Sequence, residues 1–173
     1  TIVDVRRRAK VLLIDLDTDY TLVIHLKMTG QLVVIPPATN SQSQVPRWGA
    51  GHPNDSLIGA LPDRSTRVEI SFSDAGHLFF NDQRKFGWVK VYPTMEVPNI
   101  DFMQRVGPEP LEDSFTSKEF VPRVRRRQNT TIKAAILDQT VLAGVGNIYA
   151  DESLWGARIH PATRVRDVTD KQL

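Results

Sequence analysis

A turn-like stretch, "NDQRKFGW" at residues 81–88, combines a guanidinium group with an aromatic ring. Arg84 and Phe86 stand two positions apart after a run that is typical of a strand, and Gly87 follows them. A guanidinium group can donate several hydrogen bonds in one plane, and a phenyl ring can stack or act as an apolar wedge. An ordinary loop needs neither the ring nor the glycine, so this stretch is a candidate functional turn.

A second candidate is the glycine-bounded turn in "VLAGVGNIYADE", residues 141–152. Gly144 and Gly146 permit a tight turn and leave the amides at the start of the next helix unobstructed. Asn147 can present its side-chain amide beside them, and both the unpaired N–H groups and the helix dipole favour an anion such as phosphate. A plain hairpin of two helices, in which the glycines serve only the turn, is the alternative. The residues alone leave both interpretations open.

Basic residues are clustered, although the whole chain is close to neutral. The formal net charge is +2, from 22 Lys and Arg against 20 Asp and Glu. Local clusters of cations attract phosphate even in such a chain. A solvated basic face is the alternative for either cluster alone. The clusters consist of Arg6, Arg7, Arg8 and Lys10, and of Lys118, Arg123, Arg125, Arg126, Arg127 and Lys133.

The composition argues against several classes of protein. The 173 residues contain no cysteine, so neither a disulfide framework nor a thiolate metal site can form within them. His52, Asp55 and His77 lack the spacing of metal ligands, and we expect no metal there. No run approaches the roughly 18 apolar residues of a membrane span, and no signal-peptide pattern opens the chain. We therefore expect a soluble cytosolic protein without membrane association.

The elements that must position these residues change in character once along the chain. Before residue 93, β-branched and partly alternating runs predict strands at 11–17, 21–28, 31–36, 67–73, 77–82 and 88–93. Residues 36–67, rich in Pro, Gly, Ser and Asn, predict a long irregular segment. After residue 93 the pattern predicts helices. One begins at Thr130 or Thr131 and ends before Gly144, and a second spans 147–156.

Five stretches, in order, resemble signatures of the formamidopyrimidine-DNA glycosylase family, which also includes the endonuclease VIII branch. They are "RRAKVLL", "HLKMTG", "NDQRKFG", "GPEPL" and "LAGVGNIYADESLWGARIHP", and residues 36–65 match least well. The resemblance implies an α+β fold, in which an N-terminal β-sandwich precedes a helix–two-turn–helix domain. This agrees with the order of strands and helices. It assigns 1–93 to part of the sandwich domain, 94–110 to a linker and 111–173 to an incomplete helix–two-turn–helix domain.

The resemblance also implies a bifunctional enzyme of DNA base-excision repair. The intact protein would remove oxidised purines, 8-oxoguanine and formamidopyrimidine, from double-stranded DNA by base flipping and Schiff-base chemistry. It would then cleave the abasic site by β,δ-elimination. A cytoplasmic, nucleoid-associated monomer of bacterial type is expected. The alternatives are an endonuclease VIII-type glycosylase for oxidised pyrimidines, and a damaged-DNA-binding protein without catalysis.

Matching to the family motifs assigns roles to individual residues. Met28, Arg84 and Phe86 match residues that fill the void left by the extruded nucleotide. Arg84 would probe the orphaned base, with a preference for cytosine, and Phe86 would wedge between base pairs. Lys10 matches a turn lysine that contacts the phosphate beside the lesion and donates a proton during β-elimination. Further DNA contacts match at His25, Asn147 and Lys133. The void-filling set argues against the endonuclease VIII branch, which usually fills the void differently.

Structural alternatives remain for several of these positions. Met28 could pack in the core, and Phe86 could be an exposed hairpin aromatic. Tyr149 and Glu152 either face the lesion pocket or are buried within the helix pair. At least two of the residues 6–8 are expected to be simply exposed on a strand.

The chain departs from the family pattern at its ends. The family's nucleophile is an N-terminal proline followed by glutamate, whereas this chain begins with Thr1 and Ile2. We therefore expect a piece that is truncated at both ends and inactive as a glycosylase by itself. The family's zinc finger supplies four cysteines, so its one zinc ion is expected outside these residues, and no cofactor within them.

Three internal positions also differ from the pattern. Lys27 stands where the family usually has glycine, Ser65 where histidine is frequent, and Gln128 where lysine is common. The last two differences put two DNA contacts in doubt. Arg67 and the run at residues 125–127 could substitute for them electrostatically.

Overall fold

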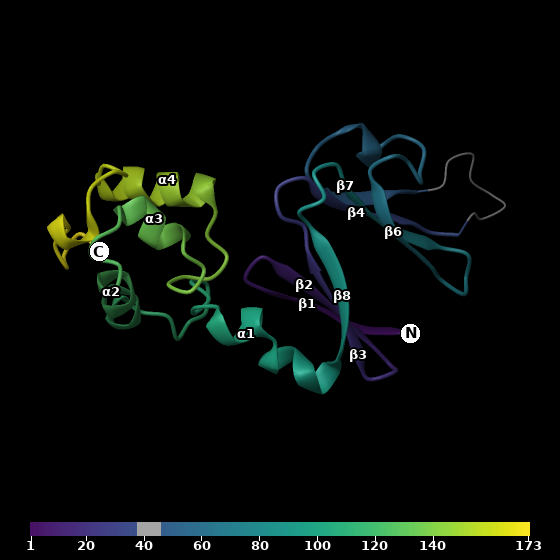
Figure 1. The fold of residues 1–173 in the computed structure, drawn as a ribbon, viewed down its shortest axis with the longest axis horizontal. Coiled ribbons are helices and arrows are strands. Elements are labelled where there is room, and N and C mark those ends of the chain that lie inside the picture. The colour runs from purple at the N-terminus through teal and green to yellow at the C-terminus, as the bar shows by residue number, and fades with distance from the viewer. Residues whose placement is uncertain (38–45) are drawn as a thin grey trace. The chain divides into compact units, whose positions relative to one another are not determined.

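The computed structural model describes residues 1–37 and 46–173, which form two compact units. The first unit comprises Thr1–Val5 and Val11–Tyr92, and the second comprises Arg6–Lys10 and Pro93–Leu173. Strands dominate the first unit and helices the second (Figure 1). The α+β class implied by the family resemblance is therefore confirmed.

The strands of the described residues form two four-stranded sheets (Figure 1). One sheet has the order β1–β2–β3–β8 and the other the order β5–β4–β7–β6. Neighbouring strands pair antiparallel in both, as in β2 with β3 and β4 with β7. The strands are β1 Ile2–Arg8, β2 Val11–Leu16, β3 Tyr20–His25, β4 Gly30–Ile35, β5 Trp48–Gly51, β6 Thr66–Ser71, β7 His77–Asp82 and β8 Trp88–Pro93.

The two sheets share an apolar core, because alternate side chains of their strands point to the same side. Ile14 of β2 and Ile24 of β3 form one buried cluster with Leu78 and Phe80 of β7. Partly buried side chains from β4, β6 and β8 surround this cluster. The first unit is thus a β-sandwich, and its core fixes the direction of the strands that end at the candidate functional turn.

The apolar pattern does not predict two of the strands. β1 lacks the pattern of a half-buried strand because Ile2, Val3 and Val5 are exposed, and only its residues 6–8 were expected to lie on a strand. β5 and a short 3-10 helix, η1 Asp55–Leu57, interrupt the segment predicted to be irregular. The part of that segment at 38–45 lies outside the described residues.

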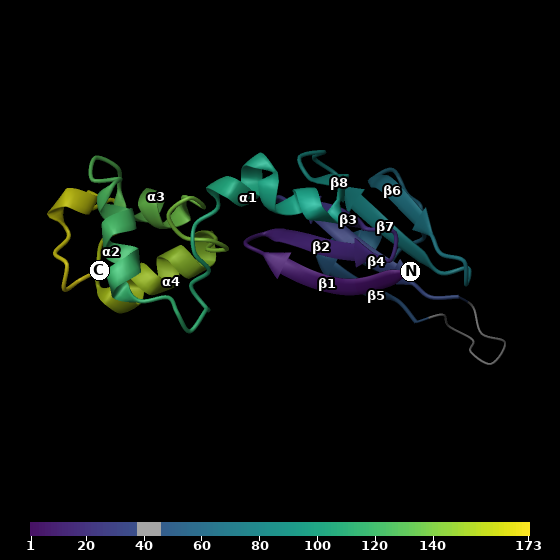
Figure 2. The same ribbon diagram turned by 90° about the horizontal axis from the view of Figure 1, so that it is seen from below.

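Several helices of the second unit lie close together (Figure 2), and they share an apolar core of their own. Ile132 and Ile136 pack there with Leu142, Ala150 and Leu154. The helical elements are η2 Thr94–Asn99, α1 Asp101–Arg105, α2 Ser117–Arg125, α3 Ile132–Leu137, α4 Asn147–Ala157 and η3 Val165–Asp167. No helix in residues 1–37 and 46–173 has the length and apolar character needed to cross a membrane.

The first predicted helix is shorter than its apolar pattern suggested. Thr131 caps α3 by accepting the N–H of Ala134, as one of the two predicted caps. The helix ends at Leu137 because the Asp138 carboxylate binds the N–H and hydroxyl of Thr140, which competes with helical hydrogen bonding. The second predicted helix is confirmed as α4. The domain limits 1–93, 94–110 and 111–173 stay a prediction.

Candidate nucleic-acid interface

The three residues matched to void filling lie together on the first unit. The Arg84 guanidinium lies with Nη1 3.6 Å from Met28 Sδ, although these residues are 56 positions apart. Its Cζ atom lies 4.8 Å from the centre of the Phe86 ring. Met28 is 66% exposed and Phe86 is 55% exposed, so Met28 does not pack in the core. The result is an exposed group of one cation and two apolar side chains.

Met28 occupies the tip of a tight turn between β3 and β4. The N–H of Gly30 bonds the carbonyl of Leu26, and a Cβ at Gly30 would overlap that carbonyl. Lys27 has a φ of 52°, in the left-handed region where a side chain is disfavoured. This conformation explains why a glycine is favourable at position 27, and the turn holds Met28 away from the core.

Asp82 organises the turn that carries Arg84 and Phe86. Its carboxylate accepts the N–H of Arg84 at 3.2 Å and the N–H of Gly87 at 2.7 Å. The hydroxyl of Thr29, from the other turn, also donates to it. Burial alone would raise the pKa of Asp82. The bonds from Thr29, Gly87, Arg84 and Phe86 outweigh it and hold the pKa below its ordinary value.

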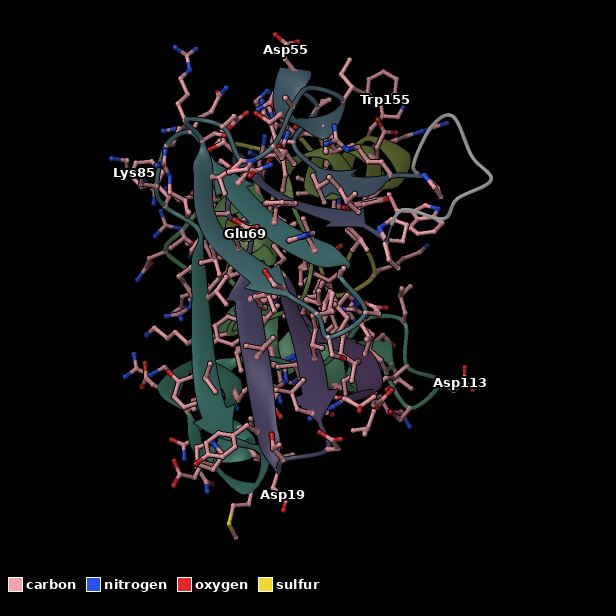
Figure 3. All side chains as sticks on the ribbon, turned by 90° about the vertical axis from the view of Figure 1, so that its right-hand side faces the viewer. Asp19, Asp55, Glu69, Lys85, Asp113 and Trp155 are labelled. Atoms are coloured by element: carbon pink, nitrogen blue, oxygen red, sulfur yellow. The ribbon has the colours of Figure 1, made fainter. Side chains whose placement is uncertain are left out.

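Gly87 serves this turn by allowing close packing and not by adopting a left-handed φ. Lys85 is the left-handed residue, with a φ of 60°, and it points away from the sheets (Figure 3). A Cβ at Gly87 would lie 2.8 Å from the Phe80 ring and 2.9 Å from the carbonyl of His25. Gly87 therefore permits the turn to pack closely against β3 and β7.

His25 is 9% exposed at the end of β3, beside the Met28 turn. Its Nδ1 accepts the backbone N–H of Lys27 at 3.0 Å, and its ring lies 5.8 Å from that of Trp88. His25 thus supports the Met28 turn through the hydrogen bond that its Nδ1 accepts.

Lys10 and Asn147, two predicted contacts, lie at the start of α4 in the second unit. Lys10 Nζ is 3.4 Å from the place that a Cβ on Gly146 would take. Gly146 is the N-cap of α4, where no side chain caps the helix, and Asn147 is its exposed first residue. The first amides of a helix lack intrahelical acceptors, and its dipole is positive there. A cation and a helix N-terminus together favour an anion.

The turn that carries Lys10 is held by Glu109, a residue for which the sequence suggested no role. The buried Glu109 carboxylate accepts Nη1 of Arg7 and Nη1 of Arg8, each at 2.9 Å, and the N–H of Ala9. Two of the arginines expected to be simply exposed are therefore ion-paired. Burial alone would raise the pKa of Glu109, but the Ala9 N–H and the guanidinium groups of Arg8 and Arg7 hold it below its ordinary value.

Lys133, another predicted contact, carries a counterion. Its Nζ lies 2.8 and 2.9 Å from the two carboxylate oxygens of Asp151 on α4. Arg125 is occupied as well, because it donates to Asp170 and to the carbonyls of Val165 and Val168. Arg125 thus ties α2 to the segment that contains η3. This structural role differs from the sequence-based expectation that residues 125–127 replace a missing DNA contact by their charge.

Ser65 and Arg67 also have internal roles in the first unit. Ser65 is buried, and its hydroxyl donates to Asp63 at 2.6 Å. Arg67 Nε donates to the carbonyl of Asp82 at 2.8 Å. Arg67 therefore supports the strand end from which the Arg84 turn begins.

Tyr149 and Glu152 are exposed on α4, so burial within the helix pair is wrong. They line a cavity of about 680 Å³ in the second unit together with Glu109, Leu142 and Gly144. Its wall is mostly apolar and includes the carboxylates of Glu109 and Glu152.

The described residues hold no set of side chains that fits a metal centre. The sequence has no cysteine, and the described residues contain no group of three His, Asp or Glu side chains that could hold a metal ion. The zinc ion implied by the resemblance therefore has no set of ligands among the described residues.

Comparison with known proteins gives matches to both units. Residues 1–89 match the model of the formamidopyrimidine-DNA glycosylase N-terminal domain, and residues 106–173 match that of the formamidopyrimidine-DNA glycosylase H2TH domain. A formamidopyrimidine-DNA glycosylase of Herpetosiphon aurantiacus is 45% identical over 157 residues, which is 91% of this chain and 49% of that protein. One of Chloroflexus aurantiacus is 39% identical over 167 residues, or 96% of this chain and 51% of that protein.

Solved structures give the same match. The Lactococcus lactis formamidopyrimidine-DNA glycosylase, bound to DNA with an abasic site, has a TM-score of 0.78 at 30% identity. The alignment covers 99% of this chain and 57% of that one. A complex of the same enzyme with DNA containing FAPY-dG also has a TM-score of 0.78 at 30% identity, over 99% of this chain and 56% of that one.

A β-sandwich unit and a helical unit in one α+β chain are thus matched by two domains of a single family. The chain belongs to the formamidopyrimidine-DNA glycosylase family. It spans about half the length of the curated relatives that it matches.

Proposed function

We propose that this chain is part of a DNA glycosylase and abasic-site lyase of base-excision repair. The protein removes oxidised purines, 8-oxoguanine and formamidopyrimidine, from double-stranded DNA and then cleaves the strand by β,δ-elimination. The observation that carries the proposal is the exposed group of Met28, Arg84 and Phe86, held by two linked turns. The Lactococcus lactis relatives bound to abasic-site and FAPY-dG DNA support it.

The exposed group suits the void that base flipping leaves in a duplex. An extruded nucleotide leaves its neighbours without a stacking partner and leaves the opposite base unpaired. Met28 and Phe86 supply apolar surface that replaces the lost stacking. Arg84 supplies only donors, and the Watson–Crick edge of cytosine offers two adjacent acceptors, whereas that of adenine mixes one acceptor with a donor. Arg84 therefore favours cytosine opposite the lesion.

The N-terminus of α4 and Lys10 suit the phosphate beside the lesion. The amides of the first turn of α4 and the Lys10 ammonium group all attract an anion. During β-elimination a base removes a proton from C2′ of the Schiff-base intermediate, and the C2′–H electron pair forms the C2′=C3′ double bond. The C3′–O bond breaks, its electron pair passes to the departing phosphate oxygen, and Lys10 protonates that oxygen. Asn147, His25 and Lys133 add further phosphate contacts.

The remaining proposals concern the whole protein. It acts as a monomer in the bacterial cytoplasm, in association with the nucleoid. Its Schiff base forms on an N-terminal proline, and its zinc ion is held by cysteines, and both of these groups lie outside residues 1–173.

The proposal is tested by excision assays with the full-length protein that contains this chain. Under single-turnover conditions, 8-oxoguanine is released faster opposite cytosine than opposite adenine. Arg84→Ala slows release opposite cytosine about 10- to 100-fold and narrows the ratio between the two opposite bases. Lys85→Ala is the matched control, because it removes a cation from the same turn without touching the void-filling group. It should weaken binding alike on both duplexes.

Two outcomes would favour the alternative functions. Faster release of an oxidised pyrimidine than of 8-oxoguanine would indicate an endonuclease VIII-type enzyme. Tight binding of the damaged duplexes without release of any base would indicate a damaged-DNA-binding protein.

A further inference from the structure

The segment of Gly107, Pro108 and Glu109 is bonded to two other segments of the second unit at once. On one side, Glu109 accepts the N–H of Ala9, and the Gly107 carbonyl accepts Nη2 of Arg8 at 2.7 Å. On the other side, the Pro108 carbonyl accepts the N–H of Ala143 at 2.9 Å. The segment thus connects the turn that carries Lys10 to the loop that leads into α4.

The loop before α4 is fixed to the same segment through Gln139. The Gly107 N–H donates to the Gln139 carbonyl at 2.8 Å. The Gln139 side chain accepts the N–H of Gly144 and donates to the carbonyl of Val145, both at 2.9 Å. Gly146, against which Lys10 Nζ lies, comes next. Both sides of the contact between Lys10 and Gly146 are therefore held by residues 107–109.

The chemistry of the Glu109 carboxylate suits this role better than that of a neutral side chain. One oxygen accepts the Ala9 N–H and the Arg8 guanidinium, and the other accepts that of Arg7. Ala9 has a φ of 52°, so its turn adopts a conformation that is disfavoured without support. A glutamine would offer one acceptor oxygen and would turn an NH₂ group toward a guanidinium donor. The arrangement of these three donors therefore matches both the negative charge and the two acceptor oxygens of the Glu109 carboxylate.

We propose that Glu109 is a positioning residue that holds Lys10 at the start of α4, where it protonates the departing phosphate during β-elimination. The proposal rests on the role given to Lys10 under the proposed function. The role proposed for Glu109 is therefore indirect. Glu109 acts by fixing the backbone of Ala9, next to Lys10, and by binding Arg7 and Arg8, so that Lys10 begins from a rigid turn.

The alternative is that Glu109 supports folding without any specific effect on Lys10. A double-mutant cycle on the full-length protein separates the two roles. The variants are Glu109→Gln, Lys10→Gln and the pair together. Single-turnover cleavage of a preformed abasic site measures elimination, and borohydride trapping measures the Schiff base that precedes it. Glu109→Asp, which keeps the charge, serves if the glutamine variant does not fold. Asp101→Asn, which removes an exposed acid of the same unit, is the matched control.

The expected result is a loss at elimination that depends on Lys10. Lys10→Gln slows cleavage about 100-fold or more, and Glu109→Gln slows it about tenfold or more, while trapping by both variants is retained. When Lys10 is already replaced by glutamine, Glu109→Gln lowers the cleavage rate by less than a further factor of about two. Asp101→Asn stays within about twofold of the parent protein.

Two results would overturn the proposal, and they are distinct. An equal loss from Glu109→Gln in both backgrounds, or an equal loss of trapping and cleavage, would reduce Glu109 to general structural support. Unchanged cleavage by Lys10→Gln, with trapping intact, would instead remove the elimination role proposed for Lys10.

Discussion

The hydroxyl of Thr29 donates a hydrogen bond to Oδ1 of Asp82, across 53 positions of sequence. Thr29 follows Met28 in one turn, and Asp82 begins the turn of Arg84 and Phe86. Asp82 is fully buried and Thr29 is partly exposed, so the carboxylate depends on protein donors such as this hydroxyl. One hydrogen bond thus couples the two turns that present Met28, Arg84 and Phe86.

Thr29→Val tests this coupling, because valine keeps the shape of threonine and removes the hydroxyl. The variant leaves the buried Asp82 carboxylate with one donor fewer, which costs about 1–3 kcal/mol in the free energy of unfolding. It should also reduce the preference for cytosine opposite the lesion. Urea unfolding and excision opposite cytosine and adenine provide the two measurements. Thr18→Val, at an exposed turn, is the control, and an equal effect of both variants would contradict the coupling.

The carboxylates of Asp82 and Glu109 should make the protein sensitive to acid. Both have a pKa below the ordinary value when folded, so the unfolded chain takes up their protons first as the pH falls. Their contribution to stability is complete above the ordinary carboxyl pKa of about 4 and is lost as the pH falls through the lower folded values. Unfolding at pH 3 to 7 should show this fall, and Asp82→Asn should make it shallower. A fall of the same size in that variant would show that Asp82 is not responsible.

Lys27→Gly should stabilise the protein. Lys27 holds a left-handed conformation that costs a side chain about 1–2 kcal/mol, whereas glycine adopts it freely. The greater flexibility of glycine in the unfolded chain offsets part of the gain, which leaves a net effect of about 0.5–1 kcal/mol. Lys90→Gly on β8 is the control of opposite sign, because glycine weakens a strand. Denaturant unfolding measures both, and destabilisation by Lys27→Gly would contradict the role of the φ angle.

Asp151→Asn should strengthen DNA binding by releasing Lys133. The carboxylate of Asp151 neutralises Lys133 in the free protein and competes with phosphate for it. The variant should bind duplex DNA more tightly, and the slope of log affinity against log salt should steepen by up to about one unit. Asp170→Asn, beside Arg125, is the control, because two backbone carbonyls retain that cation. Unchanged affinity and slope in Asp151→Asn would show that Lys133 does not face DNA.

The sequence predicts those strands and helices in which the spacing of apolar residues matches the side chains that are buried. The run 88–93 agrees with β8, and α4 begins at Asn147 as predicted, because apolar periodicity and helix-start signals coincide there. The apolar pattern does not predict the first residues of β1, because its apolar side chains are exposed. The end of α3 was misplaced because a side chain of Asp138 overrides a helical apolar pattern, and this competition is local.

The residues of the candidate site are predicted by motif similarity, whereas the residues that support them are seen only in the structure. Arg84 and Phe86 are recognisable by type and spacing, but their proximity to Met28 depends on how β4 pairs with β7. Glu109 stands about 100 positions from its partners in the β1–β2 turn, and no periodicity connects them. Long-range hydrogen bonds of this kind leave no pattern in a single sequence.

Covalent trapping is the most direct test of the proposed function. The full-length protein is mixed with a duplex that carries 8-oxoguanine opposite cytosine, and borohydride is added to reduce any Schiff base. We predict a covalent protein–DNA adduct that disappears when the N-terminal residue is blocked. The Arg84→Ala variant should form the same adduct more slowly. Tight binding of the same duplex without any adduct would contradict the proposed chemistry and leave a DNA-binding protein without catalysis.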